Sequence, residues 1–338
     1  MIDINRRMFF KKATVGLASG AMLLTPKTLS ANESVQDKSN KIGSYIDLSL
    51  CDGCKDFDTP KCVSACRNKN SIHFPEPQLP LKPYWPRKNY EDWSTKRDVI
   101  DRLTPYNWTF VEKVSVNGED VYIPRRCMHC DNPSCMNLCP FGTIEKSKEG
   151  LVSIDREYCM GGAKCRDVCP WEIPTRQAGV GLYMKLIPSL AGGGVMYKCD
   201  GCVDLVAKNE LPVCQTSCPK NAIKFGNFEE IKAQAKSRAD EINGYLYGLE
   251  QAGGTGTIYI SKVPFEDINK AIEDDKIAKN DKLNGRPHMK VNIEDKMDDT
   301  QNWMMATLIA PIAGISAAAI AVHKSKKEVA DGITKYGE

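Results

Sequence analysis

The chain has 338 residues, with 26% charged and 42% hydrophobic side chains and a formal net charge of +3 at pH 7. This length supports one large or two small domains with a hydrophobic core, and the composition is ordinary for a folded protein body. The first 31 residues carry five basic groups and one acid, so the rest of the chain is nearly neutral. It has no basic patch of the kind that nucleic-acid binding requires.

The N-terminal residues have the pattern of an export signal. Arg6 and Arg7 stand shortly before two aromatic residues, an uncharged run extends from Ala13 to Pro26, and small residues follow at Ser30-Ala31. The run is too short to cross a bilayer, which takes about 20 residues, and paired arginines are typical of a twin-arginine signal. The sequence therefore predicts a twin-arginine signal peptide over residues 1–31, with an ordinary secretory signal as the alternative.

Fifteen cysteines are the most unusual feature of the composition. The number is odd, so an all-disulfide framework would leave one thiol over, and such frameworks are typical of short chains. The cysteines form four groups along the sequence: Cys51, Cys54, Cys62 and Cys66; Cys127, Cys130, Cys135 and Cys139, followed by Pro140; Cys159, Cys165 and Cys169, followed by Pro170; and Cys199, Cys202, Cys214 and Cys218, followed by Pro219. This repetition indicates internal repeats of one unit.

The spacing within the groups resembles the bacterial ferredoxin pattern C-x2-C-x2-C-x3-C-P. In that pattern three thiolates wrap one corner of an iron–sulfur cluster, and the fourth reaches a neighbouring cluster. The proline ends a short helical turn because it cannot continue the hydrogen-bond ladder, and Arg67 takes its place after the first group. A single C-x2-C also suits a zinc knuckle or a redox dithiol, but neither gives a reason for the repeated x3-C step. The sequence thus predicts four iron–sulfur clusters.

The third group lacks one ligand. Cys159, Cys165 and Cys169 occupy positions one, three and four, and Gly162, which has no ligand atom, occupies position two. The cluster bound by Cys159 and Cys165 should therefore be [3Fe–4S], or a [4Fe–4S] cluster whose fourth iron has solvent or another non-cysteine ligand. Loss of this cluster is the remaining alternative.

The segments between and after the groups give weaker signals. Residues 67–126 form an insertion rich in proline and tryptophan, which is either an ordered partner surface or a covering loop. Leu151–Asp155 and Thr257–Val263 read as strands, and Phe228–Ile242 reads as a helix. His129 lies between two cysteines of the second group, where we expect it to tune or shield a cluster. No catalytic triad, paired-carboxylate motif or nucleotide-binding motif stands out.

The C-terminal region predicts a membrane anchor. An uncharged run extends from Trp303 to Val322, and a cluster of lysines follows it. At about 1.5 Å per residue the run can cross the hydrocarbon core, and trailing lysines favour a cytoplasmic C-terminus. We therefore expect a transmembrane helix over residues 301–323, a cytoplasmic tail over 324–338 and a body at the periplasmic face of the inner membrane. A buried core helix is the alternative.

Taken together, the cysteine groups resemble a known family: the four-cluster iron–sulfur subunits of DMSO-reductase-type molybdoenzymes, such as respiratory formate dehydrogenase, and of membrane-bound nickel–iron hydrogenases. The resemblance covers roughly residues 45–230, by four motifs in order. It implies an α+β fold of two tandem bacterial-ferredoxin-like units with insertions, with residues 231–300 as an extension and linker. It also implies an electron-transfer subunit between a large catalytic oxidoreductase subunit and an integral membrane, quinone-reactive or cytochrome b subunit.

The resemblance further implies how the cysteines share the clusters, with the first group paired to the fourth and the second to the third. It assigns one cluster to Cys51, Cys54, Cys62 and Cys218, its neighbour to Cys66, Cys199, Cys202 and Cys214, another to Cys127, Cys130, Cys135 and Cys169, and the deficient one to Cys139, Cys159 and Cys165. The expected cofactors are three [4Fe–4S] clusters and one [3Fe–4S] or non-cysteine-ligated [4Fe–4S] cluster.

Two other classes of function stay open. A self-contained iron–sulfur oxidoreductase would have its own substrate site, and the lack of a flavin, nucleotide or pterin motif counts against it. A cysteine-rich structural protein of the cell envelope would contain no iron. Neither the partner enzyme nor the direction of electron flow can be read from the sequence.

Overall fold

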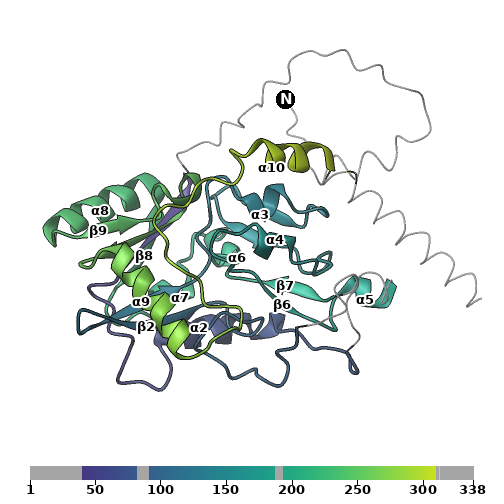
Figure 1. Cartoon of the computed structure of the whole chain (residues 1–338), viewed down its shortest axis with the longest axis horizontal. Coiled ribbons are helices and arrows are strands. Elements are labelled where there is room, and N and C mark those ends of the chain that lie inside the picture. The colour runs from purple at the N-terminus through teal and green to yellow at the C-terminus, as the bar shows by residue number, and fades with distance from the viewer. Residues whose placement is uncertain (1–39, 82–90, 187–192, 310–311, 313–338) are drawn as a thin grey trace, which may run out of the picture. The chain divides into compact units, whose positions relative to one another are not determined.

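Figure 1 shows the computed structural model of the chain, which describes residues 40–81, 91–186, 193–309 and 312. Four hydrogen-bonded sheets and a series of mostly short helices make up this described part, which is an α+β arrangement. The predicted signal peptide over residues 1–31 and the predicted tail over 324–338 lie outside the described residues and stay predictions.

The largest sheet joins segments from both ends of the described chain. Its strand order is β8–β1–β10–β9, with β1 at Ile42–Asp47, β8 at Ile223–Asn227, β9 at Tyr245–Tyr247 and β10 at Thr257–Ser261. β1 runs parallel to β10 and antiparallel to β8, and β9 pairs antiparallel with β10. The strand predicted at Thr257–Val263 is therefore present, and the segment before the first cysteine group is held by segments that follow the last one.

Helix α8 (Phe228–Glu241) covers one face of this sheet, where the sequence predicts a helix. The side chain of Asn227 accepts a hydrogen bond from the backbone N–H of Glu229, which is a favourable N-cap. Ile258 and Ile260 of β10 pack against the buried side of the helix. Their spacing follows the two-residue period of a strand, so the residue between them faces the other core.

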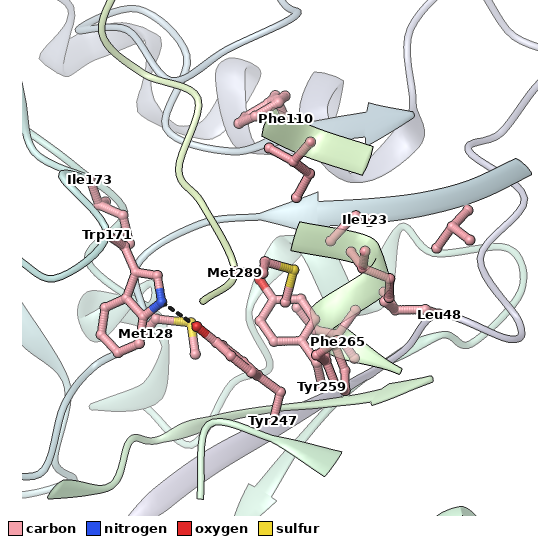
Figure 2. Close-up of a cluster of buried hydrophobic side chains, with 14 of the residues drawn as sticks. Leu48, Phe110, Ile123, Met128, Trp171, Ile173, Tyr247, Tyr259, Phe265 and Met289 are labelled. Carbon is pink, nitrogen blue, oxygen red and sulfur yellow. Dashed lines mark hydrogen bonds between the residues drawn. The ribbon is translucent and has the colours of Figure 1, made fainter. Parts of the chain in front are cut away.

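That other core lies between β10, the hairpin of β2 (Phe110–Val116) and β3 (Glu119–Arg125), and helix α9 (Phe265–Ala278), and Figure 2 shows its side chains. Tyr259 of β10 is 1% exposed and belongs to this core together with Phe265 of α9. Trp171, which lies just after the third cysteine group, donates a hydrogen bond from Nε1 to the hydroxyl of Tyr247 at 2.7 Å. The core therefore packs directly against a cysteine-bearing loop.

Three two-stranded sheets complete the strand inventory of the described residues. They are β2 (Phe110–Val116) with β3 (Glu119–Arg125), β4 (Ile144–Lys146) with β5 (Val152–Ile154), and β6 (Thr175–Gln177) with β7 (Val195–Tyr197). The turn between β2 and β3 is Asn117-Gly118, and both residues have positive φ, as a tight hairpin turn requires. This first hairpin lies inside the predicted insertion over 67–126, and β5 lies within the strand predicted at 151–155.

The remaining helices are short, and most of them carry or adjoin a cysteine. They are α2 (Lys61–Asn70), α3 (Ser134–Asn137), α4 (Lys164–Asp167), α5 (Leu182–Leu186), α6 (Val203–Val206), α7 (Val213–Thr216) and α10 (Thr300–Met304), with 3-10 turns at Ser71–His73 and Gln251–Gly253 and a π-helical turn at Met305–Ile309. Four of them organise the site below.

The predicted transmembrane helix over 301–323 is contradicted. No helix in the described part of the chain is long and apolar enough to cross a membrane. Within the uncharged run, α10 gives way to the π-helical turn, and Ala306 packs against Leu138 and Val168 with 4% exposure. An apolar run can be buried against protein as well as in lipid. In the described part of this run Ala306 is buried against protein, whereas Trp303, Met304, Leu308 and Ile312 are exposed. The localisation predicted from this anchor, at the periplasmic face of the inner membrane, is therefore contradicted as well. Residues 310–311 and 313–338 lie outside the described residues.

Candidate functional site

All four cysteine groups place the cysteine at position three of the pattern at the same point of a short helix. Cys62, Cys135, Cys165 and Cys214 are each the second residue of α2, α3, α4 and α7, respectively. A proline precedes three of these helices, at positions 60, 133 and 212, and proline is well suited to a helix start because its own N–H is not needed there. The groups are therefore repeats in structure as well as in sequence.

The groups that are followed by a proline have the shortest helices. In the second, third and fourth groups the helix has four residues and ends before the last cysteine of the group. After the first group Arg67 stands in place of proline, and α2 continues to Asn70, ten residues in all. This confirms that the proline ends the helical turn, and it leaves Cys62 and Cys66 one turn apart on the same helix.

The C-x2-C loops of the first and fourth groups are copies of each other. Both read Cys-Asp-Gly-Cys, and in each the aspartate Oδ1 accepts a hydrogen bond at 2.9 Å from the backbone N–H of the second cysteine, Cys54 or Cys202. The glycine and the second cysteine of each loop have positive φ between 52° and 71°. The short aspartate side chain thus holds both loops in a conformation that exposes backbone N–H groups to the thiols.

The structure brings the fifteen cysteines together in four sets that mix the sequence groups. Set A is Cys51, Cys54, Cys62 and Cys218, set B is Cys66, Cys199, Cys202 and Cys214, set C is Cys127, Cys130, Cys135 and Cys169, and set D is Cys139, Cys159 and Cys165. The four cysteines of set A line one pocket. In the other sets, burial is the largest cause that raises the pKa of Cys66, Cys130 and Cys165, and the next is the charge of a fellow member, Cys199, Cys169 and Cys159, respectively. The sets follow the pairing that the resemblance implied, and ligation of iron by each set stays a prediction.

Interactions between thiols of different sets place the sets in one row. After burial, the charge of Cys214 in set B is the largest contribution to the raised pKa of Cys62 in set A. Cys127 of set C also raises the pKa of Cys199 of set B, after burial and Asp200, and Cys135 of set C raises that of Cys165 of set D, after burial and Cys159. These neighbours give the order A, B, C, D.

The thiols are suited to a cofactor that takes them as thiolates. All fifteen are free, and seven are buried. Burial raises the pKa of the Cys51, Cys135 and Cys202 thiols to about 12, so iron that binds here must displace protons. Next to sets B and C, the buried Nε and Nη1 of Arg126 have no hydrogen-bond partner within the described structure. Unpaired donors that face thiols fit an anionic group rich in sulfur acceptors, as an iron–sulfur cluster is.

Several hydrogen bonds reach the cysteine sulfurs themselves. The backbone N–H groups of Gly201 and Met196 donate to Cys199 and Cys159 at 3.4 and 3.5 Å, and the Asn70 side chain donates to Cys66 at 3.5 Å. His129 Nε2 lies 3.9 Å from Cys199 Sγ. Such bonds stabilise negative charge on sulfur and are one means by which a protein sets a cluster's reduction potential.

At set D the loop that lacks a cysteine is held by its backbone. Gly162, at the vacant ligand position, is exposed. Its neighbour Gly161 has φ +67°, and a Cβ there would lie 2.3 Å from the carbonyl oxygen of Gly194. Arg176 Nη1 donates to the Gly161 carbonyl at 3.1 Å. The loop therefore keeps its shape without a fourth side-chain ligand.

A partly buried carboxylate completes this support. Glu91 accepts two hydrogen bonds from Arg166, at 2.7 and 2.8 Å, and one from Arg176 at 3.0 Å. Arg166 is adjacent to Cys165. Burial opposes ionisation of Glu91, but the hydrogen bonds and charge of Arg166, together with Arg176, outweigh it and lower the pKa of this carboxyl. We call Glu91, Arg166 and Arg176 the set D clamp.

Sequence reasoning missed the clamp and the two buried cations at the centre of the row, Arg126 and Lys198. The clamp has no local signal, because Glu91 is far from its partners in the sequence. The two cations did have a local sequence signal, because each directly precedes the first cysteine of its group, Cys127 or Cys199.

Comparison with known proteins gives a consistent result. Two family models, both described as a 4Fe-4S dicluster domain, match residues 50–143 and 119–228. Hydrogenase-2 operon protein HybA of Escherichia coli O157:H7 is 27% identical over 366 aligned residues, which cover 96% of each chain. The formate dehydrogenase-O iron-sulfur subunit of Escherichia coli K12 is 29% identical over 236 residues, covering 67% of this chain and 68% of that one.

A third relative is similar over part of the chain. The probable anaerobic dimethyl sulfoxide reductase chain YnfG of Escherichia coli K12 is 30% identical over 194 residues, which are 56% of this chain and 75% of that protein. The relatives, the two matched domains and the thiol sets all indicate an iron–sulfur protein. The chain therefore belongs to the family of ferredoxin-type iron–sulfur subunits of oxidoreductases, and its cofactors are iron–sulfur clusters.

Proposed function

We propose that this protein is the electron-transfer subunit of a multi-subunit oxidoreductase and carries electrons one at a time along four iron–sulfur clusters. The observation that carries the proposal is the single row of thiol sets A, B, C and D, in which a thiol of each set lies near enough to the next set to raise the pKa of a thiol there. A row of this kind gives electrons a path through the protein from one end to the other. Family membership supports the same function.

Each set supplies the ligands for one cluster. Sets A, B and C have four thiols each, as a [4Fe–4S] cluster needs. Set D has three, because Gly162 stands where a cysteine would be, so we assign it a [3Fe–4S] cluster. A [4Fe–4S] cluster with a solvent ligand is the alternative, and the exposed backbone at Gly162 leaves room for one.

The chain's own residues hold the clusters and control their surroundings. The short helices position the third thiol of each group, backbone N–H groups donate to sulfur, and the buried side chains between the sets exclude water. When bound, the clusters supply reversible one-electron oxidation and reduction. Burial and hydrogen bonding then decide the potential at each point of the row.

A row of clusters needs a partner at each end. We propose that a catalytic oxidoreductase subunit meets one end and an integral membrane, quinone-reactive subunit meets the other, as the family resemblance implies. At set A, Cys51, Cys54 and Cys218 are partly exposed, and exposed Phe57 lies in the same loop region. Electrons would enter or leave there.

Chemical analysis of anaerobically purified full-length protein tests the proposal. We expect about fifteen iron atoms per chain, with a similar amount of acid-labile sulfide, and a three-iron paramagnetic resonance signal in the oxidised protein. Iron and sulfide near zero would overturn the electron-transfer function. Full iron content with no three-iron signal would leave that function in place and reassign set D to a four-iron cluster.

A further inference from the structure

The described part of the chain buries six cationic side chains of arginine or lysine, and four of them are paired with carboxylates. The pairs are Arg102 with Asp281, Arg125 with Glu112, and both Arg166 and Arg176 with Glu91. Arg126 and Lys198 are buried as deeply, at 2% and 5% exposure, but neither forms an ion pair with any described carboxylate. Burying an uncompensated charge is costly, so these two positions require negative charge from another source.

Arg126 lies near thiols of two different sets. One nitrogen, Nη2, donates to Ser44 Oγ at 2.6 Å, and the guanidinium lies 4.7 Å from the ring centre of Phe225. Its other side-chain nitrogens, Nε and Nη1, have no partner among the described residues. Arg126 directly precedes Cys127 of set C, and Cys214 and Cys199 of set B are the cysteines that interact with its charge most strongly.

Lys198 lies at the same boundary. Its Nζ donates to the backbone carbonyls of Val152 and Cys199, the latter at 3.0 Å. The strongest charges near it after burial are Cys127 and Cys135 of set C and then Cys199 of set B, all ahead of Asp200. The lysine is therefore fixed by two neutral carbonyls, and its charge is left to act on the thiols of both inner sets.

His129 lies near both cations and is held in one orientation. The Val152 N–H donates to His129 Nδ1 at 2.9 Å, so a neutral ring carries its proton on Nε2, which faces Cys199 Sγ. The histidine thus adds a hydrogen-bond donor at this place but no charge, and the positive charge comes from Arg126 and Lys198.

The outer sets lack this arrangement at the matching positions. Arg126 and Lys198 each directly precede the first cysteine of a C-x2-C loop that serves an inner set. At the outer sets A and D the same position is occupied by Leu50 and Tyr158, which are 39% and 49% exposed. The loops are repeats, so the difference is specific to the centre of the row.

We propose that Arg126 and Lys198 form a cationic junction between sets B and C that raises the reduction potentials of the two inner clusters. The inference rests on the proposed function, since it concerns the clusters assigned to these sets. Reduction adds one negative charge to a cluster, and a fixed positive charge a few ångströms away in a buried setting favours that state. The junction also lowers the repulsion between an electron on one inner cluster and the charge of the other.

Potentiometric titration with dithionite, followed by paramagnetic resonance, tests the junction on the full-length, iron-loaded protein. Cys202→Ser and Cys130→Ser, which each alter one inner set, assign the inner signals. We expect Arg126→Gln and Lys198→Gln each to lower the midpoint potential of at least one inner cluster. The expected size is at least tenfold in the one-electron reduction equilibrium, about 59 mV. Glutamine removes the charge and keeps an amide donor, on a side chain that is shorter than that of arginine or lysine.

Charge-conserving variants and a matched control separate the junction from general packing. Arg126→Lys and Lys198→Arg should keep most of the wild-type potential. Arg102→Gln removes a buried arginine whose charge is already balanced by Asp281, and it should leave all the potentials unchanged. If Arg126→Gln loses iron, Lys198→Gln still decides the question. Wild-type potentials in an iron-loaded glutamine variant would overturn the junction, and so would equal shifts in the lysine and glutamine variants of Arg126. Absence of iron and sulfide from the wild type would overturn the proposed function instead.

Discussion

The two ends of the row hold their cysteine loops in opposite ways. Set A has four thiols, and its first loop is supported by Asp52, whose ion pair with Lys220 is open to solvent, with the lysine side chain 54% exposed. Set D has three thiols, and its loop is supported by the set D clamp, whose arginines are 9% and 2% exposed. The end with fewer ligands has the more deeply buried support. The comparison suggests that buried backbone anchoring substitutes for the missing thiol in fixing the geometry of set D.

Breaking the clamp should have the largest effect. Glu91→Gln leaves Arg166 and Arg176 buried without their carboxylate, which we expect to cost on the order of 3 kcal/mol of unfolding free energy. The three-iron signal should be lost before the signals of the other clusters. Urea unfolding and paramagnetic resonance on the same anaerobic preparation would measure both.

Glu76→Gln is the matched control for that change. Glu76 also makes a bidentate ion pair, with Arg97, but both side chains are exposed. Removal of the Glu76 charge should therefore not move the unfolding midpoint. The stability lost by Glu91→Gln should also depend on pH. Because the pKa of Glu91 is lowered from 4.5, the difference from wild type should be complete above that pH and should shrink as the pH falls further. A difference that grows in acid would contradict the clamp.

Adding one methyl group to each loop sharpens the comparison. Gly161→Ala and Gly53→Ala both force alanine into positive φ, which costs about 1–2 kcal/mol. At Gly161 the new Cβ also meets the backbone oxygen of Gly194, whereas at Gly53 it meets the ring of Tyr122, which is a side chain and can move. We therefore expect Gly161→Ala to lower the unfolding midpoint more. Equal losses would show that the set D backbone is no more tightly held than that of set A.

Restoring the missing ligand should make the two ends alike in iron content. Gly162→Cys supplies a fourth thiol at an exposed position of a loop that already has the right shape. The variant should gain about one iron atom per chain and lose the three-iron signal, because set D would then hold four irons. Gly162→Ser adds a side chain of similar size without a thiol and serves as the control. An unchanged three-iron signal in the cysteine variant would mean that position 162 does not face the cluster.

The smallest effect is expected at the solvent-exposed support of set A. Lys220→Gln removes the partner of Asp52, and a solvent-exposed ion pair of this kind contributes at most about 1 kcal/mol. Iron content and the set A signal should stay at wild-type levels, as measured by chemical analysis and paramagnetic resonance. A loss as large as that from Glu91→Gln would remove the contrast between the two ends.

Much of this site could be predicted from spacing because its elements are local. The C-x2-C loops and the x3 step lie within a few residues of one another, and the effect of Pro140 or Arg67 on a helix is felt within one turn. Helix α8 and strand β10 have clear periodic patterns as well. What escaped prediction was nonlocal, such as the pairing of β1 with β10 and the clamp around Glu91.

The membrane-helix prediction for the uncharged C-terminal run failed for a different reason. Its lack of charge fits lipid and protein surroundings equally, and only its neighbours can decide between them. Ala306 lies against Leu138 and Val168, which directly follow α3 and α4, the helices that carry Cys135 of set C and Cys165 of set D. Nothing in the residues of the run itself marks that contact, so hydropathy alone led to the wrong prediction.

The interleaving of groups into sets has a consequence for biosynthesis. Sets C and D draw all their cysteines from residues 127–169, whereas sets A and B join residues 51–66 to residues 199–218. On a ribosome, the ligands of C and D are complete while the last group is still unmade, and the loops that close A and B are far longer and slower to form. Iron loading should therefore proceed from the D end of the row toward the A end. A nascent chain stalled after its third cysteine group would already contain every ligand of sets C and D.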